Sequence, residues 1–115
     1  MLVHTMFDEY ELLELFECEP RVIDRDSEIY VYSSINNYGF KFELYISIYD
    51  MNIILTLTYK DFSSPIIDLN IDNVKRIATN SNKLNIYTNE SDCPNAIVHF
   101  KPSFRIELTG KLIDN

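Results

Sequence analysis

The sequence predicts a mainly β protein, an antiparallel β-sandwich or strongly bent meander of about eight strands with one short N-terminal helix. Three observations support this class. After Pro20, apolar and polar residues alternate with a period of two over most of the chain. Asparagines and prolines separate the alternating runs, as expected for tight turns and strand margins. Only the segment before Pro20 has the spacing of a helix.

The segment that begins at Asp8 predicts the helix. Leu12, Leu13 and Phe16 recur at i, i+1 and i+4, and the glutamates of the segment fall largely on the other side. Asp8 is a suitable N-cap because its carboxylate can accept a backbone N–H. The helix is expected to end before Pro20, since the residue preceding a proline is displaced from helical geometry.

The β region begins with a long hairpin. Residues 40–49 alternate between apolar and polar positions, and residues 53–60 follow the same period of two except that Ile54 stands on the polar side. Asp50, Met51 and Asn52 between the two runs have the length and chemistry of a hairpin connection. These runs predict two adjacent antiparallel strands. Further strands are expected at residues 29–33, 66–70, 74–79, 84–88, 96–101 and 104–108.

The chain is expected to form one domain over residues 1–115. An N-terminal acidic helix or arm, residues 1–28, would pack on a β core of residues 29–115. A chain of 115 residues with 46% hydrophobic and 24% charged residues has the composition of a globular domain.

Charge is distributed unevenly along the chain. Residues 1–28 contain nine carboxylates and two arginines, a net of 2 − 9 = −7, whereas residues 29–115 contain nine acids and eight bases, a net of −1. Such a concentration is suited to attracting a cationic partner. The total of −8 disfavours nucleic acid and anionic membranes as partners, because both require clustered Lys or Arg. A basic protein is the expected partner, and charge that serves solubility alone is the alternative.

Targeting signals are not evident in the sequence. The N-terminus lacks the basic and apolar regions of a secretory signal, and no apolar run is long enough to span a membrane. Cys18 and Cys93 have no metal-ligand spacing and are expected to be reduced thiols. The predicted location is the cytoplasm.

No catalytic signature is present, and the protein is predicted not to be an enzyme and to need no cofactor. His99 falls in a predicted strand without an accompanying nucleophile motif, and His4 lies beside a terminus expected to fray. On an extended strand, Asp24, Asp26 and Glu28 would share one face, but they lack the glycine and distant glutamate of a calcium loop. Surface charge is the preferred interpretation, and no metal site is predicted.

Tyrosines mark the first strands. Tyr30 and Tyr32 alternate with aliphatic residues, and Tyr45 and Tyr49 do the same on the next strand, which suggests a tyrosine-bearing outer face. Tyrosine is enriched at protein interfaces because it combines a stiff apolar ring with a polar tip. The alternative is that these rings pack between two sheets or under the helix.

Three segments of the chain carry a resemblance to a known family. They are Leu15-Phe16-Glu17-Cys18-Glu19-Pro20 leading into Ile29-Tyr30-Val31-Tyr32, the hairpin of residues 39–60, and Phe100-Lys101-Pro102-Ser103-Phe104 followed by Ile106 and Leu108. In these segments the chain resembles the small acidic β-rich immunity proteins of bacterial contact-dependent growth inhibition and related polymorphic toxin systems. The resemblance implies a protein that binds a cognate toxin domain, often a nuclease, and protects the producing cell from it; the family implies no catalytic residues.

The expected interface combines carboxylates that meet the cationic cleft of a nuclease with tyrosines that anchor the complex. Two alternatives stay open. One is a small acidic β module with a structural or small-ligand role, and the other is an acidic phage-type inhibitor of a host nucleic-acid-binding protein. The candidate toxin-binding residues are Glu17, Glu19, Asp24, Asp26, Glu28, Tyr30, Tyr32, Tyr45 and Tyr49.

Overall fold

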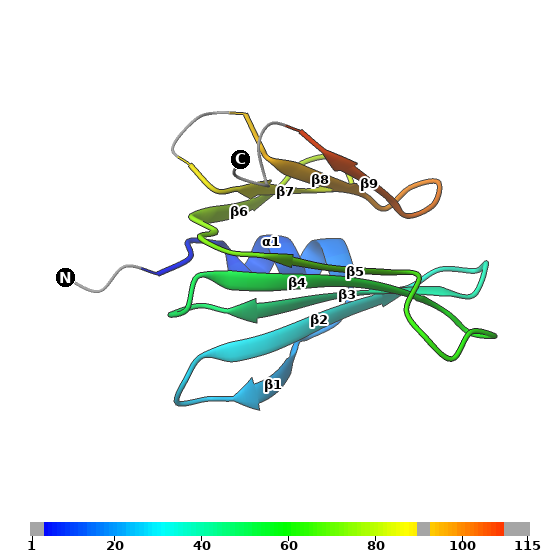
Figure 1. The fold of residues 1–115 in the computed structure, drawn as a ribbon, viewed down its shortest axis with the longest axis horizontal. Helices are drawn as coiled ribbons and strands as arrows, with labels where there is room; N and C mark the ends of the chain where they lie inside the picture. Colours follow the sequence, from blue (N-terminus) through cyan, green and yellow to red (C-terminus); the bar gives the residue numbers. More distant parts are fainter. Residues whose placement is uncertain (1–3, 90–92, 110–115) are drawn as a thin grey trace.

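Two antiparallel sheets lie face to face in the computed structural model, which describes residues 4–89 and 93–109 (Figure 1). One sheet has five strands in the order β1-β2-β3-β4-β5, and the other has four in the order β6-β7-β8-β9, so each is a meander of sequence neighbours. The elements are α1 (Glu9–Phe16), β1 (Arg21–Asp24), β2 (Ile29–Ile35), β3 (Phe40–Ser47), β4 (Asn52–Tyr59), β5 (Ile67–Ile71), β6 (Arg76–Thr79), β7 (Lys83–Tyr87), β8 (Ala96–His99) and β9 (Arg105–Leu108).

The predicted mainly β class with one short helix is confirmed, and the described residues form nine strands where about eight were expected. The additional strand is β1, an edge strand whose four residues are all exposed. Its sequence, Arg-Val-Ile-Asp, has no buried face and therefore little periodicity to detect. The predicted strand ending at Tyr49 is shorter than expected, because β3 stops at Ser47 and Tyr49 lies in the turn that follows.

The turns have the chemistry that the asparagines predicted. Between β6 and β7, Ser81 and Asn82 have φ angles of 50° and 64°, and Asn80 and Lys83 exchange two backbone hydrogen bonds of 3.0 Å. Two consecutive residues of positive φ define the tight hairpin turn whose twist matches that of the strands. Before β3, the side-chain oxygen of Asn36 accepts the backbone N–H groups of Tyr38 and Phe40.

Helix α1 contacts both sheets and lies behind the strands, between the two layers, in Figure 1. Asp8 caps it as predicted, accepting the backbone N–H of Tyr10 at 2.9 Å. The helix buries Leu12 and Phe16. The Phe16 ring lies 5.4 Å from Tyr32 and 5.1 Å from Phe100, measured between centroids, so it joins the helix to both halves of the sandwich.

The segment before the helix is held by hydrogen bonds to both sheets. The Thr5 backbone N–H donates to the Ile48 carbonyl at 3.1 Å, and its buried hydroxyl donates to the Val74 carbonyl at 2.8 Å. Met6 pairs in parallel with Arg76 at the edge of the smaller sheet. The terminus that was expected to fray beside His4 lies outside the described residues, and the attachment of Thr5 and Met6 fixes where α1 begins.

Candidate protein-binding site

A hollow of about 370 Å³ opens where the N-terminal segment and helix α1 meet the five-stranded sheet. It has aromatic walls and two carboxylates, and we call it the tyrosine pocket. Four of the nine predicted interface residues line it, namely Glu28, Tyr30, Tyr32 and Tyr49; the other lining residues are His4, Phe7, Glu9, Pro20 and Ile48.

Glu28 and Tyr30 form the polar wall of the pocket. The Tyr30 hydroxyl donates a hydrogen bond to the Glu28 carboxylate, and this bond raises the pKa of Tyr30, with burial and the Glu28 charge acting in the same direction. The positive charge of Arg25 acts on Tyr30 in the opposite sense. Glu28 has a left-handed backbone with φ of 54°, a conformation that a residue with a Cβ rarely adopts. This conformation ends the β1–β2 turn and precedes the strand that carries Tyr30.

Tyr32 forms the deep wall. Its side chain belongs to the core cluster and only 2% of the residue is exposed. Burial raises the pKa of Tyr32 to about 12, and the negative charge of Glu9 contributes in the same direction. Among the described residues, no group forms a hydrogen bond with the Tyr32 hydroxyl, although the residue lines the pocket. Both tyrosines therefore remain protonated in an acidic environment.

The expected outer face that carries all the tyrosines is not formed. Tyr30 and Tyr32 pair with Ile46 and Leu44 of β3, and cross-strand partners share a face, so these two tyrosines are on the core face of the sheet. Tyr45 pairs with Val31 and lies on the opposite, outer face. The alternative of packing between the sheets is thus correct for Tyr32, which is too buried to supply an exposed anchor.

The remaining predicted carboxylates are exposed at three places around the helix side. Asp24 ends β1 and Asp26 lies in the β1–β2 turn, where the Asp24 carboxylate accepts the backbone N–H of Asp26 at 3.1 Å. These residues and Glu28 do not alternate on an extended strand, because residues 25–28 form a turn. Glu17 ends the helix with φ of 61°, and Glu19 lies in the connection to β1.

The acids of residues 8–28 are not neutralised by the protein's own cations. Within the part of the chain that the structure describes, the ion pairs join Lys41 to Glu43 and Glu107 to His99 and Arg105, and none involves this acidic segment. Glu11 instead accepts hydrogen bonds from the backbone and hydroxyl of Thr79 at 3.4 Å.

Cations gather on the outer face of the four-stranded sheet. Arg76 stacks on the Tyr87 ring with its guanidinium carbon 3.9 Å from the centroid, and register places Lys83 beside His99. Arg76 also borders a second hollow, which Asp8, Glu9 and Glu11 line, so the cations of this sheet extend to the start of the helix.

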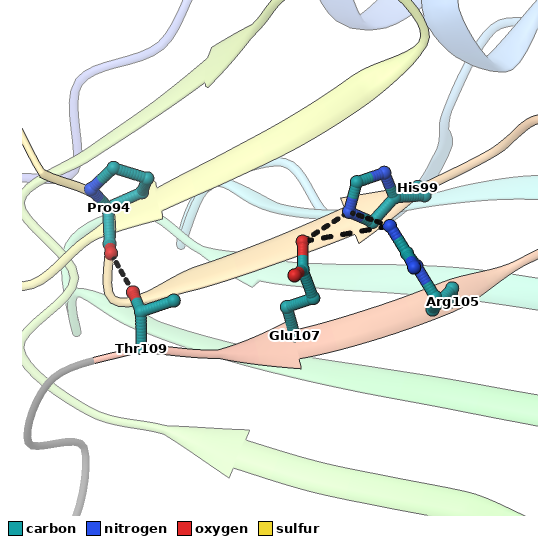
Figure 2. A network of polar contacts seen from close by, with 5 residues as sticks. All are labelled: Pro94, His99, Arg105, Glu107 and Thr109. Atoms are coloured by element: carbon teal, nitrogen blue, oxygen red, sulfur yellow. Dashed lines mark hydrogen bonds and ion pairs between the residues drawn. The ribbon is translucent and has the colours of Figure 1, made fainter.

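His99, expected to be structural, takes part in a polar network on this second sheet (Figure 2). Its Nε2 contacts both the Glu107 carboxylate and, at 3.2 Å, the guanidinium of Arg105. The hydrogen bond from His99 lowers the pKa of the exposed Glu107 carboxyl, aided by the positive charges nearby. At the far end of the same hairpin, the Thr109 hydroxyl donates to the Pro94 carbonyl. The network fastens β8 to β9.

Glu9 and Phe7 line the pocket but were not among the predicted site residues. A signal for Glu9 was present: residues 9, 12 and 16 follow an i, i+3, i+7 spacing, which puts Glu9 at the end of the buried stripe of Leu12 and Phe16. Nothing in the spacing identifies Phe7.

Within residues 4–89 and 93–109, no three His, Cys, Asp or Glu side chains lie close enough together to hold a metal ion. No helix in these ranges combines the length and apolar character needed to cross a bilayer. Cys18 donates its thiol to the Ser33 carbonyl at 3.1 Å, which fastens the connection after the helix to β2.

The chain was compared with known protein families, protein sequences and solved structures. No protein-family model and no curated protein sequence matches the chain. Its structure is similar to that of a chain in the contact-dependent growth inhibition toxin–immunity protein complex from Klebsiella pneumoniae 342, with a TM-score of 0.69, 19% identity, and coverage of 94% of this chain and 96% of that chain. The resemblance predicted from the sequence is therefore confirmed at the level of the fold: this chain is built like a component of a contact-dependent growth inhibition toxin–immunity complex.

Proposed function

We propose that this chain is an immunity protein that binds and neutralises a cognate toxin domain of a contact-dependent growth inhibition system. The observation that carries the proposal is the shared fold, which extends over nearly the whole of both chains. Size and strand layout agree along the full sandwich, so the similarity is not confined to one common hairpin.

The net negative charge of this chain supports the role of inhibitor within such a pair. A toxin that cleaves nucleic acid must bind phosphates and therefore carries exposed Lys and Arg. This chain has a net charge of −8 and a helix side rich in unpaired carboxylates, which fits the inhibitor and not the nuclease. We therefore propose a nuclease as the target, with the acidic side of this non-enzymatic protein placed over its cationic active site.

Attraction and affinity would come from different residues. Exposed carboxylates such as Asp24, Asp26 and Glu19 accelerate encounter with a basic surface over long distances. Affinity requires anchors that become buried, and the half-exposed Tyr49 at the mouth of the tyrosine pocket is one such group.

The test is protection from the toxin domain encoded next to this chain. Cells that produce that domain are expected to grow only when this chain is produced with it, and purified mixtures are expected to form a stable complex in which RNA or DNA cleavage stops. Protection without a complex, or a complex that still cleaves and kills, would reject the proposal. A matched control is the same experiment with an unrelated acidic protein of similar size, which should not protect.

A second candidate function is binding of a small organic cation. The observation that favours it is the tyrosine pocket, whose volume of about 370 Å³ falls in the range of small-molecule sites and whose walls are aromatic with converging carboxylates. A direct binding measurement with small cations separates the two functions, because only the second requires high affinity for a free ligand.

A further inference from the structure

We infer that the tyrosine pocket receives the guanidinium group of an arginine side chain from the toxin. This inference rests on the proposed function, because it takes the occupant from that partner. The pocket joins the helix start, the β1–β2 turn and the core face of β2, three elements that the fold already fixes against one another.

The electrostatics of the pocket select a cation. Glu9 enters from α1 and Glu28 from the end of the β1–β2 turn, and no ion pair in the described residues neutralises either one. Two carboxylates converging on one hollow repel each other, and a cation between them relieves that repulsion. The protein's own Arg25 affects Tyr30 electrostatically but does not line the pocket.

A second observation is independent of the acids. Only 2% of Tyr32 is exposed, yet the residue lines the pocket and its hydroxyl is accessible in the hollow. Within the described residues no group forms a hydrogen bond with that hydroxyl, so it is open to an incoming group. A hydroxyl oxygen there can accept an N–H from the occupant.

The shape of the site favours guanidinium over ammonium. Phe7, Tyr30, Tyr32 and Tyr49 give the pocket aromatic walls, and a planar guanidinium stacks on such faces while its edge donates to carboxylates. Its five donors match two carboxylates and a hydroxyl better than the three donors of a compact, strongly hydrated ammonium. The Tyr30 hydroxyl is already engaged with Glu28, which fixes that carboxylate for the incoming group.

The experiment first uses the isolated protein and a defined probe. Acetyl-arginine amide is titrated into the isotopically labelled protein while NMR follows the ring signals of Tyr30 and Tyr32, with acetyl-lysine amide and the uncharged acetyl-citrulline amide as comparisons. We expect saturable shifts of both rings with the arginine derivative and about tenfold weaker binding of the other two. Equal shifts with the lysine derivative, or none with arginine, would overturn the assignment.

Variants locate the binding. Glu28→Gln keeps the acceptor for Tyr30 but removes the charge, Glu9→Gln removes the second charge, and Tyr32→Phe removes the hydroxyl that lines the pocket. Each is expected to weaken the arginine derivative by about tenfold. Glu107→Gln, on the outer face of the other sheet, is the matched control and should bind unchanged. An effect of Glu107→Gln equal to that of Glu28→Gln would show nonspecific charge attraction and reject the pocket.

The toxin complex separates failure of this inference from failure of the proposed function. If wild type binds the toxin and Glu9→Gln with Glu28→Gln binds equally well, the proposed function stands and the pocket assignment falls. If the arginine derivative occupies the pocket but no toxin is bound or neutralised, the proposed function falls and with it the toxin as the source of the side chain. Loss of toxin affinity by about tenfold or more in the double variant, with unchanged thermal stability, supports both the pocket assignment and the proposed function.

Discussion

Replacing Phe16 with alanine is expected to destabilise the protein strongly, because this one ring connects the helix to both sheets. Phe16 is 3% exposed and its ring centroid lies 5.4 Å from that of Tyr32, 6.1 Å from Phe42 and 5.1 Å from Phe100. Removing a buried phenylalanine side chain costs about 3–5 kcal/mol in free energy of unfolding, through lost burial and the cavity left behind. For a domain of this length that corresponds to a melting temperature lower by about 12–20 °C.

Urea unfolding followed by circular dichroism measures this loss, and thermal unfolding provides the second value. Tyr10→Ala on the same helix is the matched control, because Tyr10 is 73% exposed and its removal should change the free energy by less than about 0.5 kcal/mol. A loss below about 1 kcal/mol for Phe16→Ala would refute the packing described for α1. It would also undermine the placement of Glu9 in the tyrosine pocket, since the helix carries that residue.

Three further changes test separate features of the structure. Glu17→Gly should raise the free energy of unfolding by about 1 kcal/mol, because the helix ends there with φ of 61° and glycine adopts that conformation without a steric penalty from a Cβ. Urea unfolding measures this change, and a lower urea midpoint in the variant would contradict the assigned helix end. Thr5→Val should lower the free energy of unfolding by about 1–2 kcal/mol, because it leaves the Val74 carbonyl without its buried donor. It should also accelerate amide hydrogen exchange in the N-terminal segment, and unchanged exchange would show that this hydrogen bond does not hold the segment. The free energy of unfolding should fall as the pH rises from about 10 toward 12. Tyrosines of the unfolded chain ionise near pH 10, whereas the pKa of Tyr32 is raised to about 12 in the folded protein, so the unfolded state loses this proton first. Tyr32→Phe should flatten the fall, and an identical pH profile in the variant would argue against the assigned burial of Tyr32.

The elements with strong local signals could be predicted from sequence. Asp8 followed by Leu12 and Phe16 indicated the capped helix, and the period of two over the hairpin indicated β3 and β4. The positive φ angles at Ser81 and Asn82 agree with the turn expected there. These features depend on short-range backbone and packing preferences, which residues close in sequence express directly.

The orientation of β2 could not be predicted, and this error changed the site. Tyr30 and Tyr32 alternate with Ile29 and Val31, and both sets are apolar enough to face a core. Pairing with β3 decides the matter, since Leu44 opposite Tyr32 is fully buried. Register between strands is a tertiary property, and a shift of one residue exchanges the two faces.

The tyrosine pocket arises from segments distant in sequence, which explains why only part of it was predicted. His4, Phe7 and Glu9 meet Glu28 and Tyr49 only because the N-terminal segment is hydrogen-bonded between the two sheets. The acidic bias of residues 1–28 was visible in the composition, but the way in which its carboxylates divide between the pocket, the β1–β2 turn and the helix end was not.

We propose that the acidic segment of residues 8–28, which includes Asp24 and Asp26, steers a basic toxin domain onto this protein. The most direct measurement is the association rate constant with that domain at low ionic strength, for wild type and for Asp24→Lys combined with Asp26→Lys in the exposed β1–β2 turn. We predict that the double variant associates about tenfold or more slowly, with the two rates converging as salt screens the interaction. Equal rates at low salt would contradict the account.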